Sequence, residues 1–351
     1  MACKISCLIS GGVDSAVATL LLKNKGFLVE GVFLRLWEEE PEKEKEKKAK
    51  IIAKILKIPF SIIDLRKEFK ARIVNYFLEE QKAGRTPNPC VLCNKEIKFG
   101  LALKKEIKIK ADFIATGHYA RIKKETKNSK FNKANFIYHL LKAKDSERDQ
   151  SYFLWRLDQK KLKKILFPIG DLKKGEVDKI AKDYKLPVSK KEKSVELCFI
   201  KNNVNSFLKK YLKQKSGNII TKDGRVIGKH NGLWFYTIGQ RKGIGLAGGP
   251  FYVLDKNLKN NELVVTKSKK DLFKKIVKIN KVNWIIGKEP KLPMRCKAKV
   301  RYRQNSSSAI IKKDKKNNYF VEFKKPQFAP TPGQSLVFYL NNEMLGGGII
   351  L

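Results

Sequence analysis

The sequence has no long hydrophobic run and few of the residues that form disulfide or metal frameworks. Its 351 residues include only three histidines and six irregularly spaced cysteines. No apolar run approaches the roughly 20 residues that a membrane-spanning helix needs. The start, Met1 to Lys4, is not followed by an apolar segment with a small-residue cleavage site. We therefore expect no membrane partner and no secretory signal, and we expect reduced cysteines in the cytoplasm.

Acidic residues are scarce as well. The 34 Asp and Glu residues face 77 Lys and Arg residues, which gives a net charge of +43. Such a field attracts polyanions and speeds their encounter. Lysine used as the default surface residue would give the same composition, and runs such as Lys43 to Lys50 and Lys312 to Lys316 are typical of solvated faces. The charge therefore favours a nucleic-acid partner without identifying one.

The first 200 residues alternate short apolar runs with helical stretches, an order that predicts an α/β fold with a doubly wound parallel sheet. Ligands of such sheets bind at the carboxyl ends of the strands. We expect a mobile loop at Lys123 to Lys133 and helical structure from Leu157 to Tyr184, interrupted near Phe167 to Gly170. The expected strands are Ile5 to Ile9, Leu28 to Leu34, Phe60 to Asp64 and Phe113 to Ala115, and the expected helices are Ala16 to Leu22, Glu42 to Lys57, Arg66 to Lys82 and Lys95 to Lys108.

The character of the chain changes near residue 201. Glycine-rich segments appear at Lys222 to Gly232 and Gly239 to Gly249, and alternating apolar and polar residues follow from Cys296 to Tyr302. Short strands separated by Pro and Gly turns are typical of a small barrel. We divide the chain into a catalytic domain (1–200), a small central α+β domain (201–272) and a C-terminal β-barrel (273–351).

The segment from Ser10 to Ser15, SGGVDS, lies between the first predicted strand and the first predicted helix. Glycines at Gly11 and Gly12 let the backbone approach phosphate oxygens closely. The free N–H groups and the positive end of the helix dipole favour an anion there, and Asp14 can hold Mg²⁺. No lysine follows the glycines, so this is not the common G-x-x-x-x-G-K-[ST] loop. An ordinary helix cap is the alternative interpretation.

Two cysteine segments carry further chemistry. Cys90 and Cys93 follow two prolines just before a predicted helix, where the dipole favours a thiolate. Cys198 follows the charged run Lys190 to Lys193, whose cations favour a thiolate as well. The pattern therefore indicates nucleophilic cysteines. Cys3, Cys7 and Cys296 fall in strand-like runs and are expected to be small core residues.

A metal site competes with this interpretation. Structural zinc would need two more ligands beside the C-x-x-C pair, and neither a second pair nor a histidine cluster is present. Three thiolates from Cys90, Cys93 and Cys198 with one open iron would form an iron–sulfur site. This alternative stays open, and no other metal site is predicted.

Several motifs occur together in one order: SGGVDS, NPCVLCNKEIKFG, TGHYARI, DQSYFLWRL, FPIGDLKKGEV, ELCFI, GQRKGIGLAGGPFYV, VRYRQ and PTPGQ followed by GGGII. Together they closely resemble the bacterial tRNA-specific 2-thiouridylases, a family of PP-loop ATP pyrophosphatases, over essentially the whole chain. SGGVDS alone is shared by several such families. The resemblance implies that sulfur is installed at C2 of the wobble uridine, U34, of certain tRNAs.

The resemblance also implies site residues. The ATP site would comprise Leu8, Ile9, Ser10, Gly11, Gly12, Val13, Asp14, Ser15, Leu34 and Gly117. Cys198 would carry a persulfide, and Cys93 would be its partner nucleophile, capable of a disulfide with Cys198. The tRNA would contact Asn88, Pro89, Cys90, His118, Arg148, Asp149, Gln150, Arg301, Tyr302 and Gln334. Some members of the family have Asp where this chain has Cys90, so no proton-transfer role is assigned to that residue.

The implied partners are tRNA and a sulfur-donor protein, either a cysteine desulfurase or a relay protein, and the implied cofactors are ATP and Mg²⁺. Two other classes of protein share part of the pattern. An ATP pyrophosphatase that amidates a small molecule would explain SGGVDS but not the two cysteine segments. A protein that only binds RNA would explain the charge but not the phosphate loop.

Overall fold

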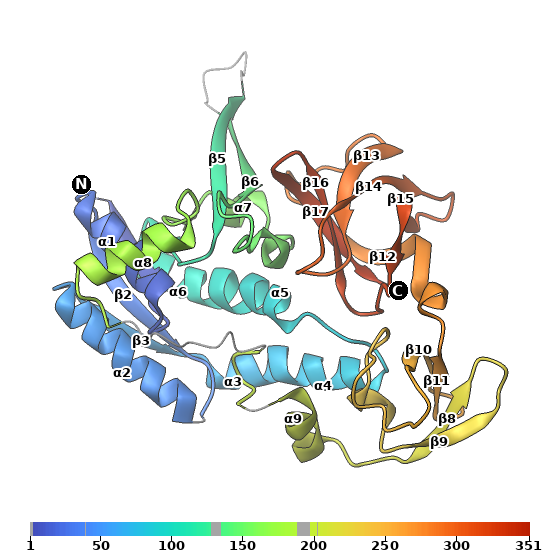
Figure 1. The fold of residues 1–351 in the computed structure, drawn as a ribbon. Helices are drawn as coiled ribbons and strands as arrows, with labels where there is room; N and C mark the ends of the chain where they lie inside the picture. The colour runs from blue at the N-terminus through green and yellow to red at the C-terminus, as the bar shows by residue number, and fades with distance from the viewer. Residues whose placement is uncertain (1–2, 39, 128–134, 188–196, 202) are drawn as a thin grey trace.

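The computed structural model of the chain describes residues 3–38, 40–127, 135–187, 197–201 and 203–351. Its strands form a parallel sheet in the N-terminal part, a small central sheet and a C-terminal barrel (Figure 1). The predicted α/β class, with a central α+β part and a terminal barrel, is confirmed. Within the described residues, no helix has the length and apolar composition needed to cross a bilayer.

The N-terminal sheet has the strand order β3-β2-β1-β4-β7, with every neighbouring pair parallel. The order reverses direction between β1 and β4, which creates the switch point where ligands of open α/β sheets bind. The loops that follow β1 and β4 meet there. The strands are β1 (Lys4–Leu8), β2 (Leu28–Arg35), β3 (Phe60–Asp64), β4 (Phe113–Ala115) and β7 (Ile165–Leu166).

Helices cover both faces of this sheet. Ile9 and Phe33 pack under α1 (Val13–Asn24), α2 (Glu40–Ile55) and α8 (Lys174–Asp183). Leu8 and Leu34, one residue away in each case, belong to the cluster on the other face. This alternation explains why both strands are apolar throughout. Two long helical rods cover the second face: α3 (Arg66–Phe69), η1 (Lys70–Val74) and α4 (Asn75–Lys82), then α5 (Pro89–Cys93), η2 (Asn94–Ala102) and α6 (Leu103–Lys108).

One sequence prediction is wrong in this part. Lys123 to Lys127 lie in strand β5 (Ala120–Lys127), paired with β6 (Asn135–Lys142), and the rest of the predicted loop lies outside the described residues. The polar composition of this segment led to the prediction of a loop, but a strand of a hairpin that projects into solvent can be equally polar (Figure 1). The interruption predicted near Phe167 to Gly170 is confirmed, because the helical stretch breaks between α7 (Gln159–Leu162) and α8, and the two-residue strand β7 lies in that break. The short helix η3 (Ser151–Leu154) precedes α7.

The central part pairs its strands in the order β10-β11-β8-β9 around a small apolar cluster. One short helix, α9, precedes the sheet and packs Phe207 among aromatic side chains of the N-terminal part. The elements are α9 (Val204–Tyr211), β8 (Gly217–Thr221), β9 (Val226–His230), η4 (Leu233–Phe235), β10 (Tyr252–Asn257), β11 (Glu262–Thr266) and η5 (Lys269–Leu272).

The C-terminal barrel closes because β12 pairs with both β15 and β17. Its interior contains Cys296, Ala298 and Val300, as their alternation predicts. Strand β17 also pairs with β6 through Met344 and Leu140, which joins the barrel to the N-terminal hairpin. The strands are β12 (Phe273–Trp284), β13 (Met294–Lys299), β14 (Ser307–Lys313), β15 (Tyr319–Phe328), β16 (Ser335–Leu340) and β17 (Glu343–Ile350).

Candidate active site

The loop between β1 and α1 has a fixed shape. Gly11 has φ +81°, and a Cβ there would lie 2.6 Å from the backbone oxygen of Lys45. Only glycine fits this position, because other residues would be strained and would clash with α2. The hydroxyl of Ser15 donates to the Gly12 carbonyl at 2.9 Å and accepts from the Ser10 N–H at 3.1 Å. The turn is therefore held in place before any ligand arrives.

The first turn of α1 keeps its donors free. Gly12 is the N-cap residue and no side chain caps the helix. The interpretation of this segment as an ordinary side-chain cap is therefore wrong, since Asp14 and Ser15 lie within the helix and do not cap it. A helix start with uncapped N–H groups and a close-approach glycine is suited to bind an anion such as pyrophosphate.

Asp14 has two partners that the sequence analysis missed. The ammonium of Lys174, at the start of α8, donates to Asp14 Oδ1 at 2.7 Å, and the hydroxyl of Tyr119 donates to the same oxygen at 3.0 Å. Lys174 also contacts Asp178 at 3.0 Å. Burial opposes its charge, but the two carboxylates hold the pKa of Lys174 above its ordinary value. A cation thus lies beside the loop predicted to hold phosphate.

The loop after β4 lies against the same turn. A Cβ on Gly117 would lie 2.5 Å from the carbonyl carbon of Asp14 and 2.6 Å from the Ser15 nitrogen. Leu8 and Leu34 belong to one apolar cluster, which also contains Cys93. The predicted ATP residues and the cysteine helix thus share a core, although their roles stay predictions.

The cysteine helix begins at Pro89, with proline in the first turn where its missing N–H costs nothing. Cys90 is half-buried and Cys93 is buried. Residues three apart on a helix lie on nearly the same face, with about 5–6 Å between their Cβ atoms. The helix therefore presents both thiols in one direction.

Cys198 is the third thiol near this helix. Phe199 is buried against Phe69, Phe77 and Phe207, with ring centroids 5.3–5.8 Å apart. This anchor fixes the neighbouring Cys198. Its side chain is in contact with solvent, although protein surrounds most of the thiol. A negative charge on Cys198 raises the pKa values of Cys90 and Cys93. The three predicted cysteines therefore lie near one another. All three are free thiols.

The favourable effect of the helix start on the thiolates is outweighed by burial. Burial raises the pKa of Cys90 to about 12 and raises the pKa of Cys93. The protein around the solvent-exposed Cys198 removes part of the hydration of its thiolate and raises that pKa as well. Loss of hydration penalises a thiolate more than the helix start favours it. The cationic run Lys190 to Lys193, invoked for Cys198, lies outside the described residues.

Lys98 partly offsets this effect and was missed by sequence analysis. Its charge lowers the pKa of each of Cys90, Cys93 and Cys198, against the larger effect of burial. It lies in η2, a π-helical stretch, and such stretches often occur at functional sites. Lys98 is the second lysine of NKEIK, five residues after Cys93. Nothing in the sequence distinguishes it from the many other lysines.

The other cysteines lie away from this cluster. Cys7 and Cys296 are buried, whereas Cys3 is half-buried near Asp112. Across the described ranges, no group of three or more His, Cys, Asp or Glu side chains is arranged to hold a metal ion. The three thiols of Cys90, Cys93 and Cys198, as they stand, do not form a ligand set for an iron–sulfur cluster.

Asn88 and Gln334, both predicted to contact tRNA, bond to each other, and their contact with tRNA stays a prediction. Asn88 Nδ2 donates to Gln334 Oε1 at 3.0 Å, and Asn88 Oδ1 accepts from the Ser335 N–H at 2.7 Å. Gln334 Nε2 donates to the Thr86 carbonyl at 2.8 Å. These bonds tie the loop before Pro89 to the barrel.

Arg301 makes a second connection between parts of the chain. One guanidinium nitrogen donates to the carbonyls of Ile238 and Ala329 and to the hydroxyl of Thr331, at 2.9–3.0 Å. Tyr302, next to it, packs on Phe153 with ring centroids 4.5 Å apart. Both residues therefore have structural partners, and their contact with tRNA stays a prediction.

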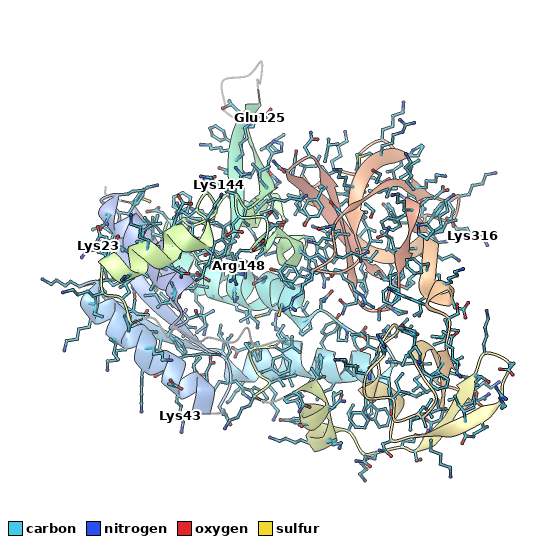
Figure 2. All side chains as sticks on the ribbon, in the orientation of Figure 1. Lys23, Lys43, Glu125, Lys144, Arg148 and Lys316 are labelled. Atoms are coloured by element: carbon cyan, nitrogen blue, oxygen red, sulfur yellow. The ribbon has the colours of Figure 1, made fainter. Side chains whose placement is uncertain are left out.

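The remaining predicted RNA contacts differ in exposure. Arg148 is exposed near the centre of the view in Figure 2. Asp149 is buried and accepts from Ser151 and Ala143, while Gln150 accepts from the Tyr119 N–H. His118 packs between Phe99 and Phe167 and bonds to Thr116 at 2.8 Å. Of these residues, Arg148 has the most accessible side chain.

Known proteins match the whole chain. Models described as the tRNA methyl transferase HUP domain, the tRNA methyl transferase PRC-barrel domain and the aminomethyltransferase beta-barrel domain match residues 3–202, 205–267 and 274–350. A "tRNA-specific 2-thiouridylase MnmA" from Buchnera aphidicola subsp. Schizaphis graminum is 44% identical, covering 99% of this chain and 96% of the relative. The chain belongs to the MnmA family. A second member, from Geobacillus kaustophilus, is 43% identical over 97% of this chain and 94% of its own.

Membership of the MnmA family accounts for the order of the motifs. The HUP-domain match contains the phosphate loop and all three clustered cysteines. The barrel match contains Arg301, Tyr302 and Gln334. The predicted resemblance is therefore confirmed at the level of the family.

Proposed function

We propose that this protein transfers sulfur to C2 of the wobble uridine of tRNA at the expense of ATP, in the cytoplasm. The observation that carries the proposal is one apolar cluster, in which Leu8 and Leu34 beside the phosphate loop join Cys93 beside the other two thiols. Relatives at 43–44% identity bear the name tRNA-specific 2-thiouridylase. The net charge of +43 suits an RNA substrate.

Uracil needs activation because oxide is a poor leaving group at C2. In our scheme the C2 oxygen attacks the α-phosphorus of ATP, pyrophosphate leaves, and the oxygen becomes part of an AMP ester. The backbone of Ser10 to Ser15 would bind the pyrophosphate. Asp14 would hold Mg²⁺, which supplies positive charge to the phosphate oxygens, once Lys174 turns from its carboxylate toward the phosphate.

Sulfur then replaces the activated oxygen. The outer sulfur of a persulfide on Cys198 attacks C2, and AMP leaves with the oxygen. The thiolate of Cys93 attacks the inner sulfur of Cys198, so that the C2–S bond keeps the electron pair and becomes the thiocarbonyl. A Cys93–Cys198 disulfide results, and an external thiol must reduce it. Alternatively, Cys93 first cleaves the persulfide and releases hydrosulfide. A sulfur-donor protein, a desulfurase or relay, reloads Cys198.

Because the described thiols do not form a ligand set, we derive no step through an iron–sulfur cluster. An iron–sulfur cluster is still worth testing, because Cys90 adds a third thiol near Cys93 and Cys198. Anaerobic purification followed by counting of iron and sulfide separates the two schemes. Stoichiometric iron with loss of activity on its removal would replace the persulfide scheme, whereas activity without iron supports it.

The decisive test measures thiouridine. Purified protein, tRNA, ATP, a thiol reductant and a cysteine desulfurase with cysteine, which delivers persulfide sulfur, should give 2-thiouridine in nucleoside mass spectrometry, and Cys198→Ser and Cys93→Ser should abolish it. Cys3→Ser is the matched control, because Cys3 is half-buried and lies outside the cluster. Full activity in either site variant would overturn the two-cysteine scheme. AMP formation that needs no tRNA would instead indicate a small-molecule synthetase.

A further inference from the structure

One motif has no role in the scheme above. The glycine-rich loop of the central part, between η4 and β10, borders an open cavity of about 420 Å³. Its lining combines three glycines with apolar side chains, one arginine and one aromatic ring. The lining residues are Arg241, Gly243, Ile244, Gly245, Leu246, Gly249, Pro250 and Phe251.

The backbone donors of this loop are unused. From Arg241 to Phe251, no backbone N–H donates to any group in the part of the chain that the structure describes. Gly243, Gly245 and Gly248 have φ values of +71° to +80°, with no backbone or side-chain wall within 3.8 Å of a Cβ built on them. The loop is mostly exposed, so these donors are accessible to a ligand, and successive donors in such turns form concave anion sites.

The loop is nevertheless held in shape at its base. Gln240 accepts from the Thr237 N–H at 3.0 Å and donates to the Lys242 carbonyl at 2.9 Å. The N–H of Gly239 bonds to the Val253 carbonyl at 2.8 Å. The donors are therefore presented by a fixed turn, which lowers the entropic cost of binding.

The charge around the cavity has one sign. No Asp or Glu occurs between Val226 and Leu254, whereas Arg241 and Lys242 are exposed at the rim. The ammonium of Lys267 lies 5.3 Å from the centroid of the Phe251 ring. An arginine recognises phosphate oxygens in a bidentate manner, so this cavity suits a phosphate group.

The base of this loop contacts the segment that precedes the cysteine helix. Thr237, at the base of the loop, contacts Thr86 of the cysteine loop, with 3.4 Å between the hydroxyl oxygens. Arg301 fixes the neighbouring Ile238 carbonyl to the barrel. These contacts connect the base of the loop both to the segment before the cysteine helix and to the barrel.

We infer that this cavity binds a phosphodiester of the tRNA strand that flanks the target nucleotide, through Arg241 and the free N–H groups of the loop. The choice of RNA rests on the proposed function. The same chemistry would bind a free nucleotide, and the experiment distinguishes the two sources.

The test compares Arg241→Ala with Arg225→Ala, an exposed arginine of the same central part that lies outside the cavity. Binding of labelled tRNA is measured without ATP over a series of salt concentrations. Arg241→Ala should weaken binding about tenfold, as expected for a charge-assisted contact, and should reduce the salt slope by about 0.7–0.9. Arg241→Lys should restore part of the affinity, and Arg225→Ala should change it little.

Equal affinity of Arg241→Ala and the wild-type protein, or an equal loss in Arg225→Ala, would overturn the inference. Weaker binding of AMP or inorganic phosphate with unchanged tRNA binding would overturn the RNA assignment in favour of a free nucleotide. If the wild-type protein binds tRNA with the expected Arg241 dependence but forms no thiouridine, only the proposed function fails. If thiouridine forms and Arg241 has no effect on binding, only this inference fails.

Discussion

Asn88 and Gln334 are 246 positions apart in the chain, yet the amide of one donates to the amide oxygen of the other at 3.0 Å. Each also bonds to backbone on the opposite side, Asn88 to the Ser335 N–H and Gln334 to the Thr86 carbonyl. The barrel therefore fixes the loop that begins the cysteine helix. A change in the barrel should reach the thiols through this pair.

Gln334→Ala removes the barrel's side of this connection. We expect the free energy of unfolding to fall by about 1–3 kcal/mol, since two or three hydrogen bonds are lost. Release of the loop should also expose Cys93, so its alkylation in a footprinting experiment should become faster. Gln214→Ala, at an exposed glutamine, is the control. Unchanged stability and unchanged labelling would show that the pair does not hold the loop.

Lys174→Met removes the cation beside the phosphate loop. Because Lys174 contacts Asp14 at 2.7 Å, we expect the KM for ATP in AMP formation to rise about tenfold or more, as for the loss of a charged contact. Lys173→Met, at an exposed neighbouring lysine, should leave the KM unchanged. Equal KM values for both variants would assign Lys174 a purely structural role with Asp14.

Lys98→Met tests the cation of the thiol cluster. The charge of Lys98 opposes the effect of burial on the pKa of Cys198. Its removal should raise that pKa further and reduce the thiolate fraction at pH 8. Alkylation of Cys198, followed by peptide mass spectrometry, should slow several-fold, and the difference should shrink at high pH where both thiols ionise. In the control variant Lys95→Met, at a lysine beside Glu96 on the same helix, Cys198 should be alkylated at the wild-type rate. A pH-independent difference would instead indicate altered access.

His118 should make the fold sensitive to acid. Burial, with the charge of Lys98, holds its pKa well below the ordinary value of 6.5. The unfolded chain therefore binds a proton that the folded chain refuses, so stability is full above about pH 6.5 and falls as the pH drops. The expected loss is up to about 1.4 kcal/mol per pH unit. His118→Asn should show a smaller difference in its free energy of unfolding between pH 7.5 and pH 5.5 than the wild-type protein. An unchanged difference in His118→Asn would contradict this assignment.

Local patterns of the sequence predicted the phosphate loop and the cysteine helix, because each lies within one short segment with a strong signal. Gly11 requires its positive φ, and Pro89 begins the helix where proline is favoured. Lys174 was not predicted, because its partner Asp14 is 160 positions away and nothing distinguishes it among the 77 basic residues. Burial of Cys93, which decides the direction of its pKa shift, likewise depends on tertiary packing.

Strand β5 shows the other limit of sequence patterns. Lys123 to Lys127 lack the apolar alternation of a half-buried strand because the hairpin extends beyond the core. The strand is stabilised by backbone hydrogen bonds to β6, and these bonds leave no pattern in the side chains. The two-residue strand β7 is too short to show any period.

The pairing of β6 with β17 has a consequence for synthesis on the ribosome. His139 and its partner Glu343 are 204 positions apart, so the outer edge of β6 waits for its partner strand for roughly 10–40 s at ordinary rates of translation. During that time an unpaired edge faces the crowded cell, where such edges recruit other chains. The lysines along the hairpin repel a second copy of the same edge. Slower decoding of the last 80 or so codons should therefore lower the yield of correctly assembled protein more than slower decoding of the first 80.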